Sequence, residues 1–96
     1  MKYYFHPEAE SEFLNAIDYF EDRQHGLGND FALEVYITIE IIIAHPKAWQ
    51  SMGDGIRRAL VSRFPYGILY AEKNQEIYIT AVMHLHREPD YWKHRI

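Results

Sequence analysis

Arginine side chains in the second half of the sequence are the residues whose type and spacing best suit chemistry. Arg57 and Arg58 are neighbours in a segment expected to be a strand, so their side chains point to opposite faces. Arg63 ends that strand, and Arg87 follows the last strand. The guanidinium fork matches phosphate oxygens, so arginines that converge at one end of a sheet could grip a phosphodiester. Alternatively, Arg58 or Arg57 pairs with a helix acid such as Glu34 or Glu40.

Histidine and aromatic residues near the C-terminal end form a second group of candidates. His84 and His86 lie one residue apart and share a face of the expected strand. Such a pair can supply two zinc ligands, although the spacing fixes no third, and histidine is also the usual acid or base near neutral pH. The alternative is a structural role, with the imidazoles bonded to backbone or to Tyr91. Tyr91 offers a flat ring for stacking on a base, whereas Trp92 is expected to close the core.

The rest of the composition limits the classes of chemistry. The chain has no cysteine, which excludes a disulfide scaffold, a cysteine nucleophile and a thiolate zinc site. It carries no glycine-rich phosphate loop and no His-Glu-x-x-His motif. The acids Glu8, Glu10 and Glu12 are spread around a helix start, where we expect them to serve the first turn only. No cofactor or metal is expected.

The formal net charge of −4 conceals an asymmetry between the two halves of the chain. Residues 1–45 carry a balance of −7, and residues 46–96 a balance of +3. An anionic partner should therefore meet the second half and be repelled by the first. The alternative is a solvated acidic helix face beside an ordinary sheet.

The location of the protein is also open to a prediction. The longest apolar stretch, around Ile41 to Ala44, is far too short to span a bilayer. The N-terminal residues turn polar at His6 and lack the apolar core of a signal peptide. We therefore expect a cytoplasmic protein without a membrane partner.

The first half of the sequence predicts a short strand and two helices. Residues 2–5 read as an aromatic strand, and Pro7 suits the first turn of a helix whose apolar residues recur at spacings of three and four. The glycines around Leu27 end this helix, and Asn29 or Asp30 is expected to cap the next. Residues 37–43 are β-branched and could form a strand, but no breaker interrupts residues 30–44, which favours a helix ending at Pro46.

The second half predicts a meander of strands. Residues 53–55 form a turn, and strands are expected over residues 56–63, 66–72 and 77–85, followed by a short helical or irregular tail. In the last strand, Ile77, Ile79, Ala81, Met83 and Leu85 should face one way, and the residues between them the other.

These elements predict a single α+β domain over residues 1–96, in the order β-α-α-β-β-β. The helix hairpin should cover one face of an antiparallel sheet. Nothing in the sequence is expected to cover the other face, and an uncovered face usually indicates a partner.

Taken together, these segments resemble a known family over nearly the whole chain. The specific parts are a strand that starts Arg-Phe-Pro-Tyr at Arg63 and an Arg-x-Pro-x-Tyr-Trp-x-x-Arg ending from Arg87 to Arg95. Other matching segments are Phe5–Glu10, Ala16–Phe20, Gly26–Phe31, His45-Pro46, Ile56–Arg58, Tyr66–Tyr70 and Ala81–His86. In this order and at this length, the chain resembles the RelE/ParE toxin superfamily, and its ParE branch more closely.

The resemblance implies the toxin of a type II toxin–antitoxin pair, of the plasmid-stabilisation or chromosomal kind. ParE-like members poison DNA gyrase, and RelE-like members cut mRNA on the ribosome. A nuclease of this family would use Arg57 or Arg58 with Arg63 on the phosphate, His84 or Arg87 for proton transfer and Tyr91 for stacking. Three functions therefore remain open: gyrase inhibition, RNA cleavage without a metal, and a non-toxic remnant that only binds antitoxin.

The lysine content favours the ParE-like alternative. The nuclease branch is rich in lysine in its central strands, and this chain has only Lys47 and Lys73 between residues 24 and 92. The overall acidity also suits ribosome binding poorly. The expected partners are a cognate antitoxin, laid across the helix hairpin and open sheet, and either gyrase or ribosome-bound mRNA. A homodimer and a hetero-oligomer with the antitoxin are both compatible with the sequence.

Overall fold

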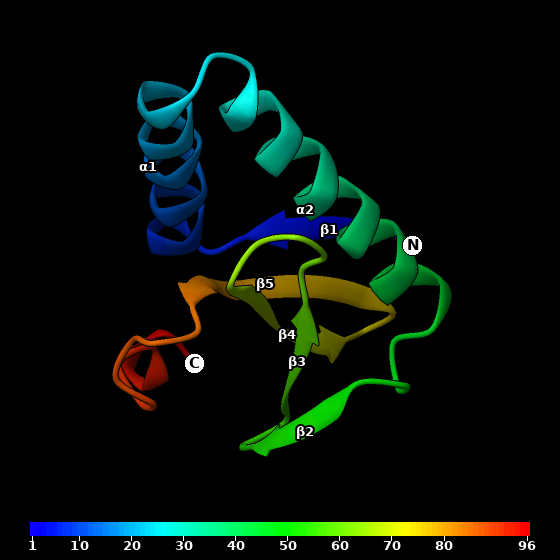
Figure 1. The fold of residues 1–96 in the computed structure, drawn as a ribbon. Helices are drawn as coiled ribbons and strands as arrows, with labels where there is room; N and C mark the ends of the chain where they lie inside the picture. Colours follow the sequence, from blue (N-terminus) through cyan, green and yellow to red (C-terminus); the bar gives the residue numbers. More distant parts are fainter.

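The structure, a computed structural model, describes residues 1–96 and has two layers (Figure 1). A hairpin of two helices lies on one face of a five-stranded sheet. The elements follow one another as β1 (Tyr3–Phe5), α1 (Pro7–Arg23), α2 (Leu27–Ala44), β2 (Gln50–Gly53), β3 (Ile56–Leu60), β4 (Tyr66–Lys73), β5 (Glu76–His84) and a short 3₁₀ turn, η1 (Lys93–Arg95). The predicted α+β class and the helix hairpin are therefore confirmed.

The strand order in the sheet is β1-β5-β4-β3-β2. Strands β2 to β5 are antiparallel neighbours, but β1 pairs with β5 in parallel, so the expected purely antiparallel sheet is corrected to a mixed one. The parallel pair arises because the chain leaves β1 through the helix hairpin and reaches the far edge before it winds back to β5. Strand β2 was not predicted, because Gln50 to Gly53 is short, mostly polar and exposed, as edge strands often are.

The main core fills the space between the helix hairpin and the sheet. Helix α1 buries Ala9, Phe13 and Ala16, which recur at the expected spacings of three and four. Helix α2 contributes Phe31, Val35, Ile39 and Ile42, and the sheet contributes residues that include Ala59, Ile68, Tyr70, Ile77, Ile79 and Val82. Helix α2 begins at Leu27 after Gly26, whose φ of +86° suits glycine, so the predicted cap at Asn29 or Asp30 lies inside the helix.

A bulge in β5 overturns the predicted alternation of its side chains. Leu69 pairs with Ala81 and Tyr70 pairs with Ile79, so Thr80 has no counterpart in β4. As a result Ile77, Ile79 and Val82 enter the core under the helices, while Ala81 and Met83 belong to a cluster on the other face. An extra residue shifts the period-two pattern by one position, and this shift is invisible in the sequence.

The second face of the sheet is covered in part, contrary to expectation. After β5 the chain turns back, and Trp92 packs with Ile56, Leu69, Ala81 and Met83, among others, in the second cluster. Trp92 is 1% exposed, which confirms that it closes a core. The C-terminal segment therefore covers part of this face, as the helices cover the first face.

Two smaller features complete the fold. Strand β3 ends at Leu60 rather than at residue 63, and Arg63 adopts a φ of +71°, so it lies in the loop before β4. None of the helices combines the length and the apolar character needed to cross a membrane.

Candidate functional site

A groove of about 350 Å³ lies at the end of the sheet where β5 leads into the C-terminal segment. Helix α1 forms one wall, the start of β4 and the end of β5 form the floor, and the C-terminal segment forms the other wall. The lining residues are Glu12, Asn15, Ala16, Tyr19, Tyr66, Val82, His84, Arg87 and Tyr91. The α1 residues share one helix face because they recur at spacings of three and four.

Of the five predicted site residues, three line this groove and two do not. His84, Arg87 and Tyr91 are brought together. Arg63 instead pairs with two acids of α2, with Nη2 3.6 Å from Asp30 Oδ2 and Nη1 3.7 Å from Glu34 Oε2. These contacts tie the loop of Arg63 to α2.

Arg58 lies on β3 and runs its aliphatic stem across the neighbouring strand. Its Cγ and Cδ lie only 3.1 Å from the position that a Cβ on Gly67 would occupy. Arg57, on the opposite face, donates a hydrogen bond to the backbone oxygen of Trp49 at 2.6 Å. The predicted convergence of all these arginines at one end of the sheet is therefore wrong, because the strands spread them apart.

Tyr91 is fixed by contacts on its hydroxyl and on its ring. The hydroxyl donates to Glu12 Oε2 at 2.7 Å, and the guanidinium carbons of Arg87 and Arg95 lie 3.9 and 4.9 Å from the ring centroid. Burial and then the hydrogen bond to Glu12 raise the pKa of the Tyr91 hydroxyl well above its usual range. The hydroxyl therefore keeps its proton, and the ring is already covered by cations.

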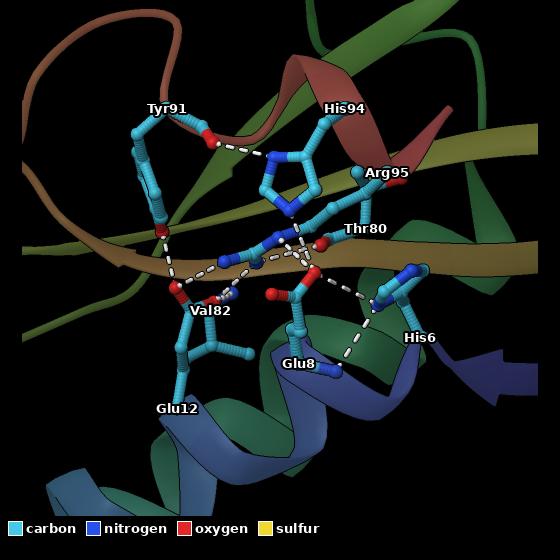
Figure 2. A network of polar contacts seen from close by, with 8 residues as sticks. All are labelled: His6, Glu8, Glu12, Thr80, Val82, Tyr91, His94 and Arg95. Carbon is cyan, nitrogen blue, oxygen red and sulfur yellow. Dashed lines mark hydrogen bonds and ion pairs between the residues drawn. The ribbon is translucent and has the colours of Figure 1, made fainter.

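Glu12 and Arg95 form a paired charge beside the groove (Figure 2). Arg95 Nη1 donates to Glu12 Oε1 at 2.8 Å, and Nη2 donates to Oε2 at 3.0 Å. The side chains of Arg95 and Glu12 are only 6% and 18% exposed. Such a bidentate pair fixes both side chains in direction as well as in distance. Glu12, which the sequence assigned only to the first helical turn, is therefore the residue that ties α1 to the C-terminal segment.

This pair also replaces a missing strand. Strand β1 stops pairing with β5 at Ile79, so the edge of β5 beyond this point has no backbone partner. The backbone N–H of Val82 donates to Glu12 Oε1 at 3.1 Å, and the backbone oxygen of Thr80 accepts from Arg95 Nη1 at 3.1 Å. Two side chains thus satisfy polar groups that would otherwise be unpaired at a half-buried edge.

A second acid of α1 holds the last turn of the chain. Glu8 Oε2 lies 2.8 Å from His94 Nε2 and 3.4 Å from Arg95 Nε (Figure 2). The hydrogen bond from His94 contributes most to lowering the pKa of Glu8. The contact with His94 is on the surface, so it positions the segment more than it stabilises the fold, whereas the contact with Arg95 reaches a side chain that is only 6% exposed.

His84 keeps one ring nitrogen free. Its Nδ1 accepts the backbone N–H of His86 at 3.1 Å, so in the neutral ring Nε2 carries the proton. The ring packs edge-on against Tyr66, with centroids 5.3 Å apart, and lies 5.2 Å from the ring of His86. The fold brings no third metal-ligating side chain to the two histidines.

The chain is similar to a known protein in structure. No family model matches the chain, and no curated protein matches it. A solved structure described as the chromosomal ParDE TA system from P. aeruginosa matches with a TM-score of 0.73 and 17% sequence identity. The match covers 88% of this chain and 95% of the other. The chain has a RelE/ParE-like fold.

On this RelE/ParE-like fold, the groove combines rings, one free imidazole nitrogen and one cation. Arg87 and His84 Nε2 can donate to an anionic or carbonyl group, and the exposed ring of Tyr19 offers an apolar contact. Sequence reasoning missed Asn15, Tyr19 and Tyr66. Asn15 and Tyr19 could have been found, because they lie on the same α1 face as Glu12 once that face is known to meet the C-terminal segment.

Proposed function

We propose that this chain is the toxin of a type II toxin–antitoxin pair, that it acts by binding DNA gyrase, and that a cognate antitoxin neutralises it. The observation that carries the proposal is the fold, which matches a structure described as a ParDE TA system over 88% of the chain. Gyrase is a cytoplasmic target in bacteria, so the cytoplasm is the proposed place of action.

The outer face of α2 supports the antitoxin as a partner. Leu33, Ile37 and Ile41 are 57%, 45% and 43% exposed, and their spacing of four places them in one stripe along the helix. A helix that is apolar on its outer face as well as its inner one is usually covered by another element. An amphipathic segment of the antitoxin would cover this stripe by lying in a helix-in-groove arrangement.

The charge around the stripe predicts the charge of the segment that would cover it. Within α1 and α2 there are nine acidic side chains and one arginine, Arg23. A second copy of this hairpin would be repelled, whereas a segment with lysine or arginine beside its apolar residues would be attracted. This favours a hetero-oligomer with the antitoxin over a homodimer through this face.

The state of the candidate nuclease residues favours gyrase over RNA as the target. RNA cleavage needs cations on the phosphate and a group free to exchange a proton. Here Arg63 is paired with α2, Arg58 lies outside the groove and the hydroxyl of Tyr91 is held by Glu12. Only Arg87 and His84 remain, which suffices to bind a protein surface.

Ribosome-dependent mRNA cleavage is the second candidate function. It is favoured by one observation, the free Nε2 of His84 in the same groove as Arg87. In that case His84 would exchange the proton, Arg87 would hold the phosphate, and no metal would be needed. A remnant that binds antitoxin without toxicity is the third.

The test is induced expression in bacteria without an antitoxin, scoring growth, mRNA integrity and DNA breaks in the same cultures. We expect growth arrest with broken DNA and intact mRNA. Arg87→Glu should relieve the arrest, because it reverses the one free cation of the groove. Arg58→Glu, outside the groove, is the matched control and should remain toxic.

Each other outcome selects a different function. Cleaved mRNA would replace gyrase by RNA as the target. Normal growth with folded protein in the cells would leave only antitoxin binding. Equal toxicity of Arg87→Glu and the parent chain would exclude the groove as the site of action.

A further inference from the structure

A second cavity, of about 470 Å³, lies on the other side of Arg95 from the groove and has no part in the function proposed above. It runs beside β1 and β5, from the β4–β5 turn to the C-terminal residues. We call it the tyrosine cavity. Its lining residues are Tyr4, Phe5, His6, Ala71, Lys73, Asn74, Tyr78, Ile79, Thr80, Arg95 and Ile96. The volume falls within the range of ligand sites in proteins.

Two tyrosine rings give this cavity a flat apolar surface. Tyr4 and Tyr78 stack with centroids 5.5 Å apart and an angle of 25° between the rings. Both hydroxyls donate to Glu76, at 3.1 Å each, which fixes the orientation of the rings. The residues are nevertheless 43% and 38% exposed, so ring surface remains open to a ligand. A fixed and exposed aromatic surface is what a stacked planar group requires.

Two largely buried polar residues, Thr80 and Arg95, line the same cavity. Thr80 is 5% exposed, and the bulge turns it out of the alternation of β5 and into the lining of the cavity. Its backbone oxygen accepts from Arg95, but its hydroxyl takes part in none of the side-chain hydrogen bonds of the chain. Arg95 Nε is also buried without a hydrogen bond, although Glu8 lies 3.4 Å away. A buried donor without a hydrogen bond, such as Arg95 Nε, is uncommon, and a bound polar group is one way to satisfy it.

Positive charge lies at the rim of the cavity. Lys73, at the end of β4, forms no ion pair, so its ammonium group is available to a ligand. His6 uses Nδ1 to accept the backbone N–H of Glu8, which leaves Nε2 free. The nearby carboxylate of Glu76 accepts hydrogen bonds from the two tyrosine hydroxyls and keeps its negative charge. An anionic group at this rim would therefore have to lie on the Lys73 side, where the ammonium group attracts it, and away from Glu76.

We propose that the tyrosine cavity binds a nucleotide, with the base against Tyr78, polar base or sugar atoms on Thr80, and the phosphate at Lys73. A nucleotide combines the planar ring, the hydrogen-bonding edges and the anionic group that these side chains would recognise. It can be a free mononucleotide or one nucleotide of an RNA strand. Because the cavity and the groove are separate, this inference does not depend on toxicity.

The test measures binding to the purified full-length chain by calorimetry and by saturation-transfer NMR. The probes are adenosine 5′-monophosphate, adenosine, ribose 5-phosphate and a short adenylate oligoribonucleotide. We expect the monophosphate to bind more tightly than adenosine, and ribose 5-phosphate, which lacks the ring, to bind least. Tighter binding of the oligonucleotide than of the monophosphate would identify a strand as the source.

The variants separate the two halves of the site. Tyr78→Ala should weaken binding of the monophosphate by about tenfold, since stacking on one ring contributes on the order of 1.4 kcal/mol. Lys73→Gln should weaken the monophosphate but leave adenosine unchanged, and it is at the surface, so it should not disturb folding. Lys47→Gln, outside the cavity, is the matched control. The proposal is wrong if no nucleotide binds at millimolar concentration, or if Lys73→Gln and Lys47→Gln bind the monophosphate equally well.

Discussion

At the scale of single residues, Glu12 connects more of the molecule than its position in the sequence suggests. Its carboxylate accepts hydrogen bonds from the hydroxyl of Tyr91, both terminal nitrogens of Arg95 and the backbone of Val82. These partners lie 70 to 83 residues away along the chain. The charge of Arg95, nearly enclosed by protein, depends on this one acid for its strongest contact.

Replacing Glu12 by glutamine should therefore destabilise the fold. Breaking one side of a largely buried pair leaves the other charge uncompensated, so Glu12→Gln should lower the free energy of unfolding by about 3 kcal/mol. Urea unfolding followed by circular dichroism measures this. Glu10→Gln, at an exposed acid of the same helix, should change it by less than about 0.5 kcal/mol. Equal stability of the two variants would show that the Glu12–Arg95 pair orients the C-terminal segment without adding to the free energy of unfolding.

At the scale of elements, the joint between α1 and α2 depends on one more carboxylate. Glu21 accepts the backbone N–H groups of Gly26 and Gly28, at 2.9 and 3.1 Å. Gly28 has no room for a side chain, because a Cβ there would lie 2.5 Å from the backbone oxygen of Ile17. The glycines that mark this turn in the sequence are therefore required by close approach as well as by backbone conformation.

The hydrogen bond from Gly26 contributes most to lowering the pKa of Glu21. A lowered pKa in the folded state means that the stabilisation is present above the usual carboxyl pKa and is lost as pH falls through the folded value. We expect Glu21→Gln to be less stable than the parent chain at pH 7, with the difference shrinking toward pH 3. Urea unfolding at both pH values measures this difference in the free energy of unfolding. A difference independent of pH would show that the side-chain shape of Glu21, and not its charge, is responsible.

At the scale of the whole molecule, the C-terminal segment joins both faces of the sheet. Trp92 fills the cluster on the second face, while Tyr91 and Arg95 reach α1 and complete one wall of the groove. The segment therefore contributes to stability and shapes the candidate site. The charged side chains are also unevenly distributed over the molecule, because most acids lie in the helix hairpin and most arginines in the second half of the chain.

Trp92→Ala tests the contribution of this segment to stability. Truncating a fully buried tryptophan should lower the free energy of unfolding by about 4 kcal/mol, because it leaves a large void in the smaller cluster. Thermal and urea unfolding measure this. Tyr36→Ala, which truncates a ring that is 47% exposed, is the control and should cost less. A loss as small as that of the control would mean that the second cluster contributes little to folding.

The sequence by itself determined the elements whose signals are local. The spacing of Phe13 and Ala16 and the unbroken run from Asp30 to Ala44 predicted the two helices. The turn at residues 53–55 and the breaks between the expected strands predicted β3, β4 and β5. These patterns depend on neighbours within a few residues, so they can be read without knowing the rest of the fold. The α+β class and the likeness to RelE/ParE-like toxins followed from their order.

Only the tertiary structure decided the parallel pairing of β1, the bulge at Thr80 and the make-up of the groove. It brought His84, Arg87 and Tyr91 together, separated Arg58 and Arg63 from them, and placed Glu12 among them. Each of these outcomes depends on contacts between residues far apart in the chain. A one-residue bulge, or a carboxylate that finds an arginine 83 positions away, leaves no periodic signal in the sequence.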